Sequence, residues 1–318
     1  MKIGETKIPH FAHKSLILCE TFHEPESALH LEGKLKLHQF FLSKNHSVEL
    51  EKYLPGIKQR ADLLVNERTA IELQCSTIPR NQVIERSNGY QSLDIQVIWI
   101  GGIQHPLTEG IQNIKLKSYE AELRQTSGKR QFLILFNPGT NTFYYYSSLF
   151  YVSGNHWIGK AKALSAARQT FPFAVPKKLN RAEFTELYNL FQAEKTKFVR
   201  NQLFARNRYK NVFWLLCYKC GFSPRQLSEV IGLPFVNADL ISGPPILWQL
   251  QVINAHKNGR SMHSLAHSGR LNVRPGSRIG DVEALLETYQ HIYLQTEEKK
   301  IERSGLVEIL YGIYCKTL

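Results

Sequence analysis

The stretch that decides the fold runs Gln59-Arg60-Ala61-Asp62-Leu63-Leu64-Val65-Asn66-Glu67-Arg68-Thr69-Ala70-Ile71-Glu72-Leu73-Gln74-Cys75-Ser76. Residues 59–65 and 70–76 are rich in apolar side chains and predict two strands, and residues 66–69 predict a turn between them. The stretch therefore predicts a β-hairpin. Because side chains alternate between the two faces of a strand, Glu72 and Gln74 share one face, and the hairpin brings Asp62 close to Glu72.

The residues around this hairpin predict a mixed α/β unit. We expect an amphipathic helix from near Pro25 to residue 42, a strand at 47–51, a helix at 79–90 and a buried strand at 95–100 that ends at Gly101-Gly102. Helices mixed with a small sheet indicate an α/β domain.

The rest of the chain has a different pattern. Residues 132–136 and 143–146 predict a second hairpin, which we interpret as a β extension of the first domain, and the pattern is helical from Lys177 almost to the end. The expected divisions are a short His-containing N-terminal segment (1–24), an α/β core (25–125), a β-hairpin extension (126–175) and a helical, basic C-terminal domain (176–318).

The composition is that of a globular protein. Of 318 residues, 43% are hydrophobic and 21% charged, which excludes a disordered, collagen-like or coiled-coil chain. We expect no transmembrane helix, because no apolar run approaches about 18–20 residues, and the first residues lack the apolar run of a signal peptide. The five scattered cysteines do not form a disulfide framework, so we expect a cytoplasmic protein.

The net charge of +13 favours a polyanionic partner, and much of it is local. Residues 177–219 hold ten Lys or Arg against three Glu, with aromatic residues between them. Such a stripe predicts salt-sensitive binding to single-stranded nucleic acid, although most of these rings are expected in the core. The predicted contacts are Lys195, Lys197, Arg200, Arg206, Arg208 and Lys210.

Asp62 and Glu72 are the candidate metal ligands. Two carboxylates held a few ångströms apart repel each other unless a cation joins them. Oxygen ligands, including a backbone carbonyl such as that of Leu73, suit Mg²⁺ or Mn²⁺. Such an ion can lower the pKa of a bound water and neutralise charge on a phosphodiester.

The pattern Asp-X9-Glu-X-Gln within this order of elements resembles the PD-(D/E)XK nuclease superfamily. The resemblance implies a restriction-endonuclease-like core in which Asp62 and Glu72 bind metal. Gln74 stands where the superfamily has a Lys that orients or activates water. A neutral amide can hold a water but supplies no positive charge, so that charge comes from another residue or the site is slow or inert.

The first predicted helix offers further candidates. Glu26, His30, Lys34 and His38 recur every four residues and form one polar stripe, which is either a solvated face or part of the site. The superfamily resemblance implies that this helix points an acid or a His into the site. Glu26 is then a metal candidate, His30 a ligand or base, and Lys34 the missing cation.

Three residues of the α/β core are candidates for DNA contact. Arg86 and Tyr90 are four residues apart on the second predicted helix and are expected to touch the scissile phosphate or the flanking DNA. Arg60 on the hairpin is expected to contribute as well. Glu49 on the first strand is a weaker metal candidate.

Several motifs together resemble the competence protein CoiA family. They are His10-Phe11-Ala12-His13-Lys14, Glu26-Ser27-Ala28-Leu29-His30 with Lys34, Gln59-Arg60-Ala61-Asp62, Ile71-Glu72-Leu73-Gln74-Cys75-Ser76, Glu85-Arg86 with Tyr90, and Val97-Ile98-Trp99-Ile100. The resemblance implies a nuclease-like domain that processes incoming single-stranded DNA in the cytoplasm alongside the recombinase. In this family the His-Phe-Ala-His segment often closes a zinc-ribbon-like element with upstream cysteines.

A structural Zn²⁺ is not expected in this chain, because its four ligands would have to be His10, His13, Cys19 and His23, and no cysteine precedes the His pair. No nucleotide cofactor is expected either, since the chain has no Walker or GxGxxG motif. Cys217 and Cys220 read as buried apolar positions.

Three functions remain open on the sequence. The first is a Mg²⁺-dependent deoxyribonuclease, and the second is a non-catalytic DNA-binding mediator that assists the recombinase. Gln74 favours the mediator, whereas the intact Asp62 and Glu72 pair favours the enzyme. The third is an RNA-directed enzyme of the same fold.

Overall fold

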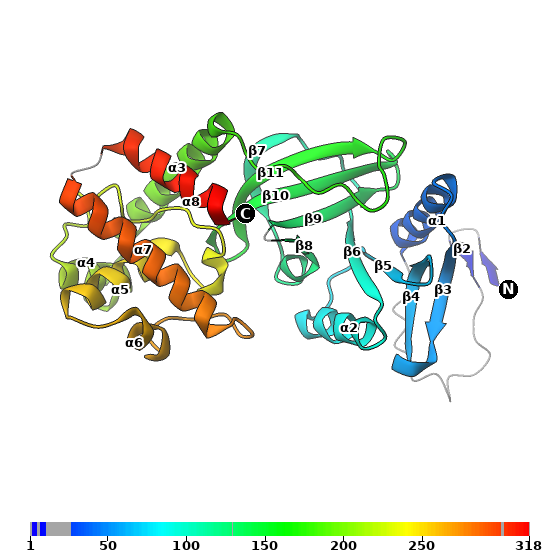
Figure 1. Ribbon diagram of the computed structural model, residues 1–318, viewed down its shortest axis with the longest axis horizontal. Helices are drawn as coiled ribbons and strands as arrows, with labels where there is room; N and C mark the ends of the chain where they lie inside the picture. The colour runs from blue at the N-terminus through cyan, green and yellow to red at the C-terminus, as the bar shows by residue number, and fades with distance from the viewer. Residues whose placement is uncertain (1, 5–6, 11–26, 129, 300–301, 318) are drawn as a thin grey trace. The chain divides into compact units, whose positions relative to one another are not determined.

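The computed structural model describes residues 2–4, 7–10, 27–128, 130–299 and 302–317 (Figure 1). The chain forms two compact units, and neither is one continuous stretch of sequence. The first unit comprises residues 1–107, 133–144 and 163–174, and the second comprises 108–132, 145–162 and 175–318. The extension predicted at 126–175 is therefore divided between the two units.

The elements of the N-terminal half are β1 (Lys2–Gly4), β2 (Lys7–His10), α1 (Ala28–Ser43), β3 (Val48–Leu54), β4 (Gln59–Val65), β5 (Thr69–Gln74), α2 (Arg80–Ser92), β6 (Gln96–Gly102), β7 (Gly110–Lys115), β8 (Gln125–Ser127), β9 (Arg130–Asn137), β10 (Thr142–Ser153) and β11 (His156–Ser165). The C-terminal half holds α3 (Arg181–Leu203), α4 (Val212–Cys220), α5 (Pro245–Lys257), α6 (Met262–His267), α7 (Ile279–Lys299) and α8 (Arg303–Thr317). Short 3₁₀ turns cover Pro55–Ile57, Glu120–Leu123, Arg208–Lys210 and Ala238–Leu240.

Among the described residues, nine strands form one mixed sheet. The strand order is β3-β4-β5-β6-β9-β10-β11-β7, with β8 beside β9. Strands β3, β4 and β5 are antiparallel neighbours, whereas β5 pairs with β6 and β6 with β9 in parallel. A parallel pair needs a crossover connection, which α2 supplies between β5 and β6. The expected α/β core is confirmed at this level.

The predicted hairpin is present as β4 and β5. Asn66 and Glu67 have positive φ angles of 50° and 59°, and the N–H of Arg68 donates to the carbonyl of Val65 at 3.2 Å. Positive φ at both central residues is the turn geometry that matches the twist of two-stranded ribbons.

Helices α1 and α2 cover opposite faces of this hairpin. On one face, Gly33 of α1 lies against Leu73, where an added Cβ would come 2.4 Å from the leucine Cδ2. On the other face, Ala61 and Ala70 pack with Tyr90 of α2 in a buried cluster. Residues 70 and 73 point to opposite faces because strand side chains alternate.

Some strand predictions need correction. Gly101 and Gly102 do not end the strand after residue 100, because β6 continues through both. They lie where β6 meets its neighbours: an added Cβ would be 2.6 Å from the Leu135 side chain at Gly101, and 2.2 Å from the Cys75 Sγ at Gly102. Strands β7 and β11, which pair with each other, were not predicted.

The helical pattern predicted from Lys177 is confirmed. Helix α3 begins at a capping box, in which the Asn180 side chain accepts from the N–H of Glu183 and Glu183 accepts from that of Asn180. Helix α4 ends at Gly221, with φ at 72°. Cys217 and Cys220 are buried, as expected. No described helix combines the length and apolar character that a membrane span requires.

Candidate active site

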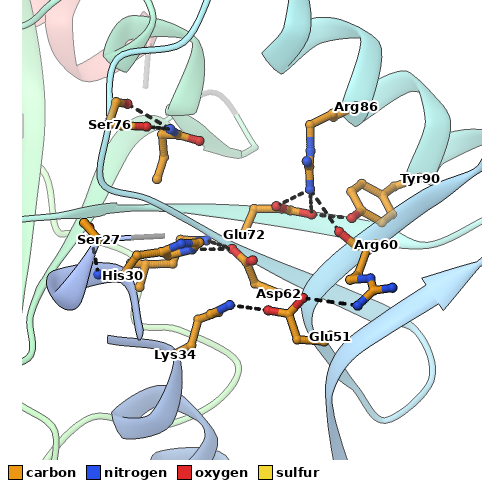
Figure 2. Close-up of polar contacts among 12 residues, drawn as sticks. Ser27, His30, Lys34, Glu51, Arg60, Asp62, Glu72, Ser76, Arg86 and Tyr90 are labelled. Atoms are coloured by element: carbon orange, nitrogen blue, oxygen red, sulfur yellow. Dashed lines mark hydrogen bonds and ion pairs between the residues drawn. The ribbon is translucent and has the colours of Figure 1, made fainter. Parts of the chain in front are cut away.

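The first carboxylate of the site belongs to Asp62 on β4 (Figure 2). Its Oδ2 accepts a hydrogen bond from the backbone N–H of Leu73 at 2.8 Å and lies 3.2 Å from Nε2 of His30 on α1. The ladder between β4 and β5 ends at the pair of Leu63 with Ile71, and beyond it the Asp62 side chain accepts the Leu73 N–H in place of a strand carbonyl. The structure thus brings His30 and Asp62 together.

The second carboxylate, that of Glu72 on β5, faces α2. Nη2 of Arg86 lies 2.6 Å from both carboxylate oxygens, and the Tyr90 hydroxyl donates to Oε1. Arg86 and Tyr90 are one helical turn apart, so both reach the same carboxylate. These two residues, predicted as DNA contacts, hold Glu72 in this structure.

The Glu72 side chain is only 4% exposed, and its ionisation is perturbed. Burial raises the pKa of Glu72 to about 7; the Arg86 guanidinium opposes this shift and the Asp62 carboxylate adds to it. Burial also raises the pKa of Tyr90, and the Glu72 carboxylate reinforces that rise. The two acids come from adjacent strands but are held by different helices: Asp62 contacts His30 of α1, whereas Glu72 contacts Arg86 and Tyr90 of α2.

A third acid lies on β3. Glu51 pairs with Lys34 of α1, and its other oxygen is 4.0 Å from Nη1 of Arg60. Glu51 has a positive φ of 53°, and the β3–β4 ladder skips it. Glu49, the weaker metal candidate, is instead 2.8 Å from Lys52 on its own strand. Sequence reasoning missed Glu51, because no pattern in the sequence signals a left-handed residue within a strand.

Gln74 is tied to the segment that follows β5. Its Nε2 donates to the carbonyl oxygen of Ser76 at 2.8 Å and to its hydroxyl at 3.2 Å. Beside it, burial raises the pKa of Cys75 to about 12, with Asp62 adding to the shift and Lys34 opposing it. A thiol with a raised pKa is a weaker nucleophile near neutral pH.

The donor types suit a hard divalent cation. Mg²⁺ takes one or two protein carboxylates and completes its shell with water and phosphate oxygens. Asp62, Glu72 and the Leu73 carbonyl are donors of this kind. Within the described part of the chain, the acids and His30 of this site do not form a group of three with ligand atoms within 4.8 Å of one another. Both Glu72 oxygens also bind Arg86, so a cation would compete with the guanidinium.

Some predicted ligands lie outside the described residues. Glu26, His13, Cys19 and His23 belong to this group, and the side chain of His10 is not described either.

The predicted nucleic-acid contacts of the second unit differ in exposure. Lys197, Arg200, Arg206, Arg208 and Lys210 are exposed. The stem of Lys195 lies against Gly232, and burial lowers the pKa of Lys195 to about 8. The first five side chains are therefore accessible to a polyanion, whereas Lys195 is largely withdrawn from solvent.

The aromatic residues of this stretch divide in the same way. Phe184, Tyr188, Phe191 and Phe213 are buried, as expected for most of these rings. Phe204 and Tyr209 are 80% and 93% exposed, and Tyr218 on α4 is 86% exposed. The segment from the end of α3 through α4 thus presents rings and basic side chains together.

The comparisons with known proteins agree with one another. Residues 26–179 match the family model described as "Competence protein CoiA, nuclease-like domain". The chain is 27% identical over 258 residues to "Competence protein CoiA" of Bacillus subtilis (strain 168), and the match covers 78% of this chain and 67% of that protein. No solved structure matches the chain.

The residues that match this nuclease-like domain include Asp62 and Glu72 and extend into both units. Residues 26–179, which carry the candidate site, are similar to the competence protein CoiA family. This confirms the family resemblance drawn from the sequence motifs. The wider kinship with the PD-(D/E)XK superfamily stays a prediction.

Proposed function

We propose that this chain is a metal-dependent deoxyribonuclease that processes single-stranded DNA in the cytoplasm during natural transformation. The observation that carries the proposal is that two acids, Asp62 and Glu72, lie on adjacent strands of a domain that matches a nuclease-like family model, where carboxylates that share a site repel each other. A shared cation relieves such repulsion. The family name supplies the link to competence.

Asp62, Glu72 and the backbone carbonyl of Leu73 would hold Mg²⁺ or Mn²⁺. A divalent ion bound there would lower the pKa of a bound water and neutralise charge on the phosphodiester. An ion bound there would compete with the Arg86 guanidinium for the oxygens of Glu72. A guanidinium displaced from Glu72 would have donors for a phosphate oxygen of the DNA, the contact proposed for Arg86.

The chain's own groups divide the remaining work. His30 is the proton acceptor in the proposal, because its ring is oriented by Asp62 at 3.2 Å and its ordinary pKa is close to neutral pH. Lys34 and Arg60, joined through Glu51, supply positive charge in place of the missing superfamily Lys. Ser76 holds the amide nitrogen of Gln74, and the amide oxygen is the acceptor that positions a water.

The proposed grip on DNA lies in the second unit. Arg200, Arg206, Arg208 and Lys210 would contact phosphates, and the exposed rings of Phe204, Tyr209 and Tyr218 would stack on unpaired bases. Unpaired bases offer their faces to such rings, whereas bases in a duplex do not. The arrangement favours a single strand.

A second candidate function is a non-catalytic mediator that binds DNA and assists the recombinase. The contacts of Glu72 favour it, because Arg86 already neutralises the carboxylate in the way that a metal would. Gln74 favours it as well, because an amide brings no positive charge to the site.

Cleavage of end-labelled single-stranded DNA tests the two candidates. We expect Mg²⁺- or Mn²⁺-dependent cleavage that EDTA abolishes and that falls about 100-fold or more in Asp62→Asn. The matched control is Glu49→Gln, which removes an exposed carboxylate from the neighbouring strand and is expected to keep full activity.

Each alternative has its own outcome in this assay. Cleavage that survives Asp62→Asn would remove the catalytic assignment. A mobility shift of the DNA without cleavage under any divalent ion would support the mediator. Preferential cleavage of a matched RNA strand would indicate an RNA-directed enzyme.

A further inference from the structure

Two imidazoles and a carboxylate meet in the second unit, on elements that the proposed nuclease activity does not use. His263 and His267 are four residues apart on α6, and Glu283 lies in the second turn of α7. Nδ1 of His263 is 2.9 Å, and Nδ1 of His267 3.5 Å, from the same Oε1 of Glu283. The two ring centroids are 4.3 Å apart.

This spacing is that of ligands around one metal ion. A tetrahedral ion with bonds of about 2.0–2.1 Å to nitrogen and oxygen holds neighbouring ligand atoms about 3.3 Å apart. The two distances to Glu283 lie on either side of that value, and one ligand atom from each residue lies within 4.8 Å of the others. Over the described ranges, no other three His, Cys, Asp or Glu residues meet in this way.

The donor set selects the kind of ion. Two imidazoles with one carboxylate suit Zn²⁺, Co²⁺, Ni²⁺ or Cu²⁺, whereas Mg²⁺ and Ca²⁺ prefer oxygen ligands. The side chains of His263, His267 and Glu283 are 72%, 49% and 23% exposed, so an ion can reach them and water can complete its shell. We propose that these three residues bind a transition-metal dication of the Zn²⁺ class that joins α6 to α7.

An ion pair alone accounts less well for the arrangement. If both imidazoles were protonated, one carboxylate would neutralise only one of two adjacent positive charges. When both are neutral, each ring offers a lone pair, and a dication uses both. Coordination through Nδ1 of His267 replaces that atom's hydrogen bond to the His263 carbonyl, which is 3.0 Å away.

The ion would link α6 to α7, which are joined in sequence by residues 268–278. Its ligands come from both sides of this connection, so the complete site exists only when α6 is packed on α7. An ion that binds the folded chain and not the unfolded one stabilises the fold by mass action. The site is independent of the proposed nuclease activity.

Zn²⁺ titration of the full chain without an affinity tag tests the proposal, by calorimetry and by thermal unfolding. The test variant is His263→Gln with His267→Gln, which retains hydrogen-bonding groups near Glu283. The matched control is His291→Gln, which removes an exposed histidine from α7 that interacts with Gln295. Any ion held by Asp62 and Glu72 is common to all three proteins and cancels in the comparison.

We expect the parent chain and the control to bind one more equivalent of Zn²⁺ than the double variant, or to bind it at least about tenfold more tightly. Zn²⁺ should raise the unfolding temperature of the parent chain and the control more than that of the double variant. Co²⁺ should give a visible absorption band only in the first two. Equal stoichiometry and equal stabilisation in all three proteins would overturn the proposal.

Two further measurements keep the test decisive. Far-ultraviolet circular dichroism and the unfolding temperature without metal establish whether the double variant folds; if it does not, His267→Gln alone replaces it. Glu283→Gln is expected to weaken Zn²⁺ binding as well. Unchanged binding in that variant would overturn the three-ligand assignment.

Discussion

At the scale of single residues, Glu72 combines burial with an ionisable group whose charge costs free energy. Its pKa rises from an ordinary 4.5 to about 7, mainly through burial. Between these values the folded chain binds more protons than the unfolded chain, so this carboxyl makes the free energy of unfolding fall as the pH rises. This loss of stability is complete once the pH exceeds the pKa of Glu72 in the folded chain.

We therefore expect Glu72→Gln to flatten the pH dependence of stability. Between pH 5 and pH 8 the parent chain should lose of the order of 2 to 3 kcal/mol more of its free energy of unfolding than the variant does. The burial of Arg86 without its partner costs the variant equally at both pH values, because a guanidinium stays charged. Urea unfolding at the two pH values measures the difference, and parallel losses would contradict the assignment.

At the scale of elements, the close approach of α1 to β5 positions His30 and Lys34. Gly33 lies between them and has no room for a Cβ, because Leu73 is packed against it and is 3% exposed. We expect Gly33→Ala to lower the unfolding temperature, because overpacking costs about 1–3 kcal/mol and exceeds the gain of up to about 1 kcal/mol in helix propensity.

The matched control for Gly33→Ala is Gly312→Ala. Gly312 is inside α8 with nothing within 4 Å of an added Cβ, so the same exchange should stabilise the chain by up to about 1 kcal/mol. Differential scanning calorimetry compares the two variants. If both shift the unfolding temperature upwards, the contact between Gly33 and Leu73 is not tight.

The segment from the end of α3 to α4 is the second element with a measurable role. Replacing Arg206, Arg208 and Lys210 by Ala should weaken binding of single-stranded DNA and make it less sensitive to salt. Each phosphate contact contributes about 0.7 to the slope of log affinity against log salt concentration. Removing three contacts should therefore change this slope by about 2.

A control for this triple variant removes equal charge from other exposed positions of the same unit. Arg225, Arg260 and Arg270 serve this purpose. Fluorescence anisotropy at several salt concentrations measures both slopes. Equal slopes in the two triple variants would show that net charge, and not this segment, governs DNA binding.

At the scale of the whole molecule, local sequence patterns predict the hairpin, α2 and the C-terminal helices. These elements depend on residues near in sequence, such as the turn at Asn66 and Glu67 or the cap at Asn180. Strands β7 and β11 depend on each other across more than forty residues, and their alternation of polar and apolar side chains is weak.

The residues of the candidate site were easier to predict from the sequence than the contacts between them. The spacing of His30, Asp62 and Glu72 predicts that they gather around the hairpin, and the structure pairs the first two. That Arg86 binds Glu72, and that Lys34 binds Glu51, depends on the direction in which each side chain points. The left-handed backbone at Glu51 sets one of these directions, and periodicity cannot reveal it.

The division into two discontinuous units predicts how fragments behave. Residues 176–318 hold the C-terminal helices but lack partners from the same unit: Arg124, which is 2.9 Å from the buried Asp239, and Ser148, which is 2.8 Å from Tyr314. We expect this fragment to unfold without a cooperative transition. A fragment of residues 108–318 keeps every segment of the unit and should melt cooperatively.

Circular dichroism during heating distinguishes these outcomes. A sharp transition in the shorter fragment would mean that the helices need no strands from the middle of the chain.

The alternation of the chain between its units also bears on descent. The polypeptide changes unit five times, at residues 107, 132, 144, 162 and 174. A gene rearrangement with a single breakpoint between residues 107 and 174 would therefore produce fragments in which at least one unit is incomplete. Domain shuffling is common among proteins whose domains are each continuous in sequence, but it would disrupt both units here. The candidate site in the first unit and the basic segment in the second are therefore expected to be inherited together.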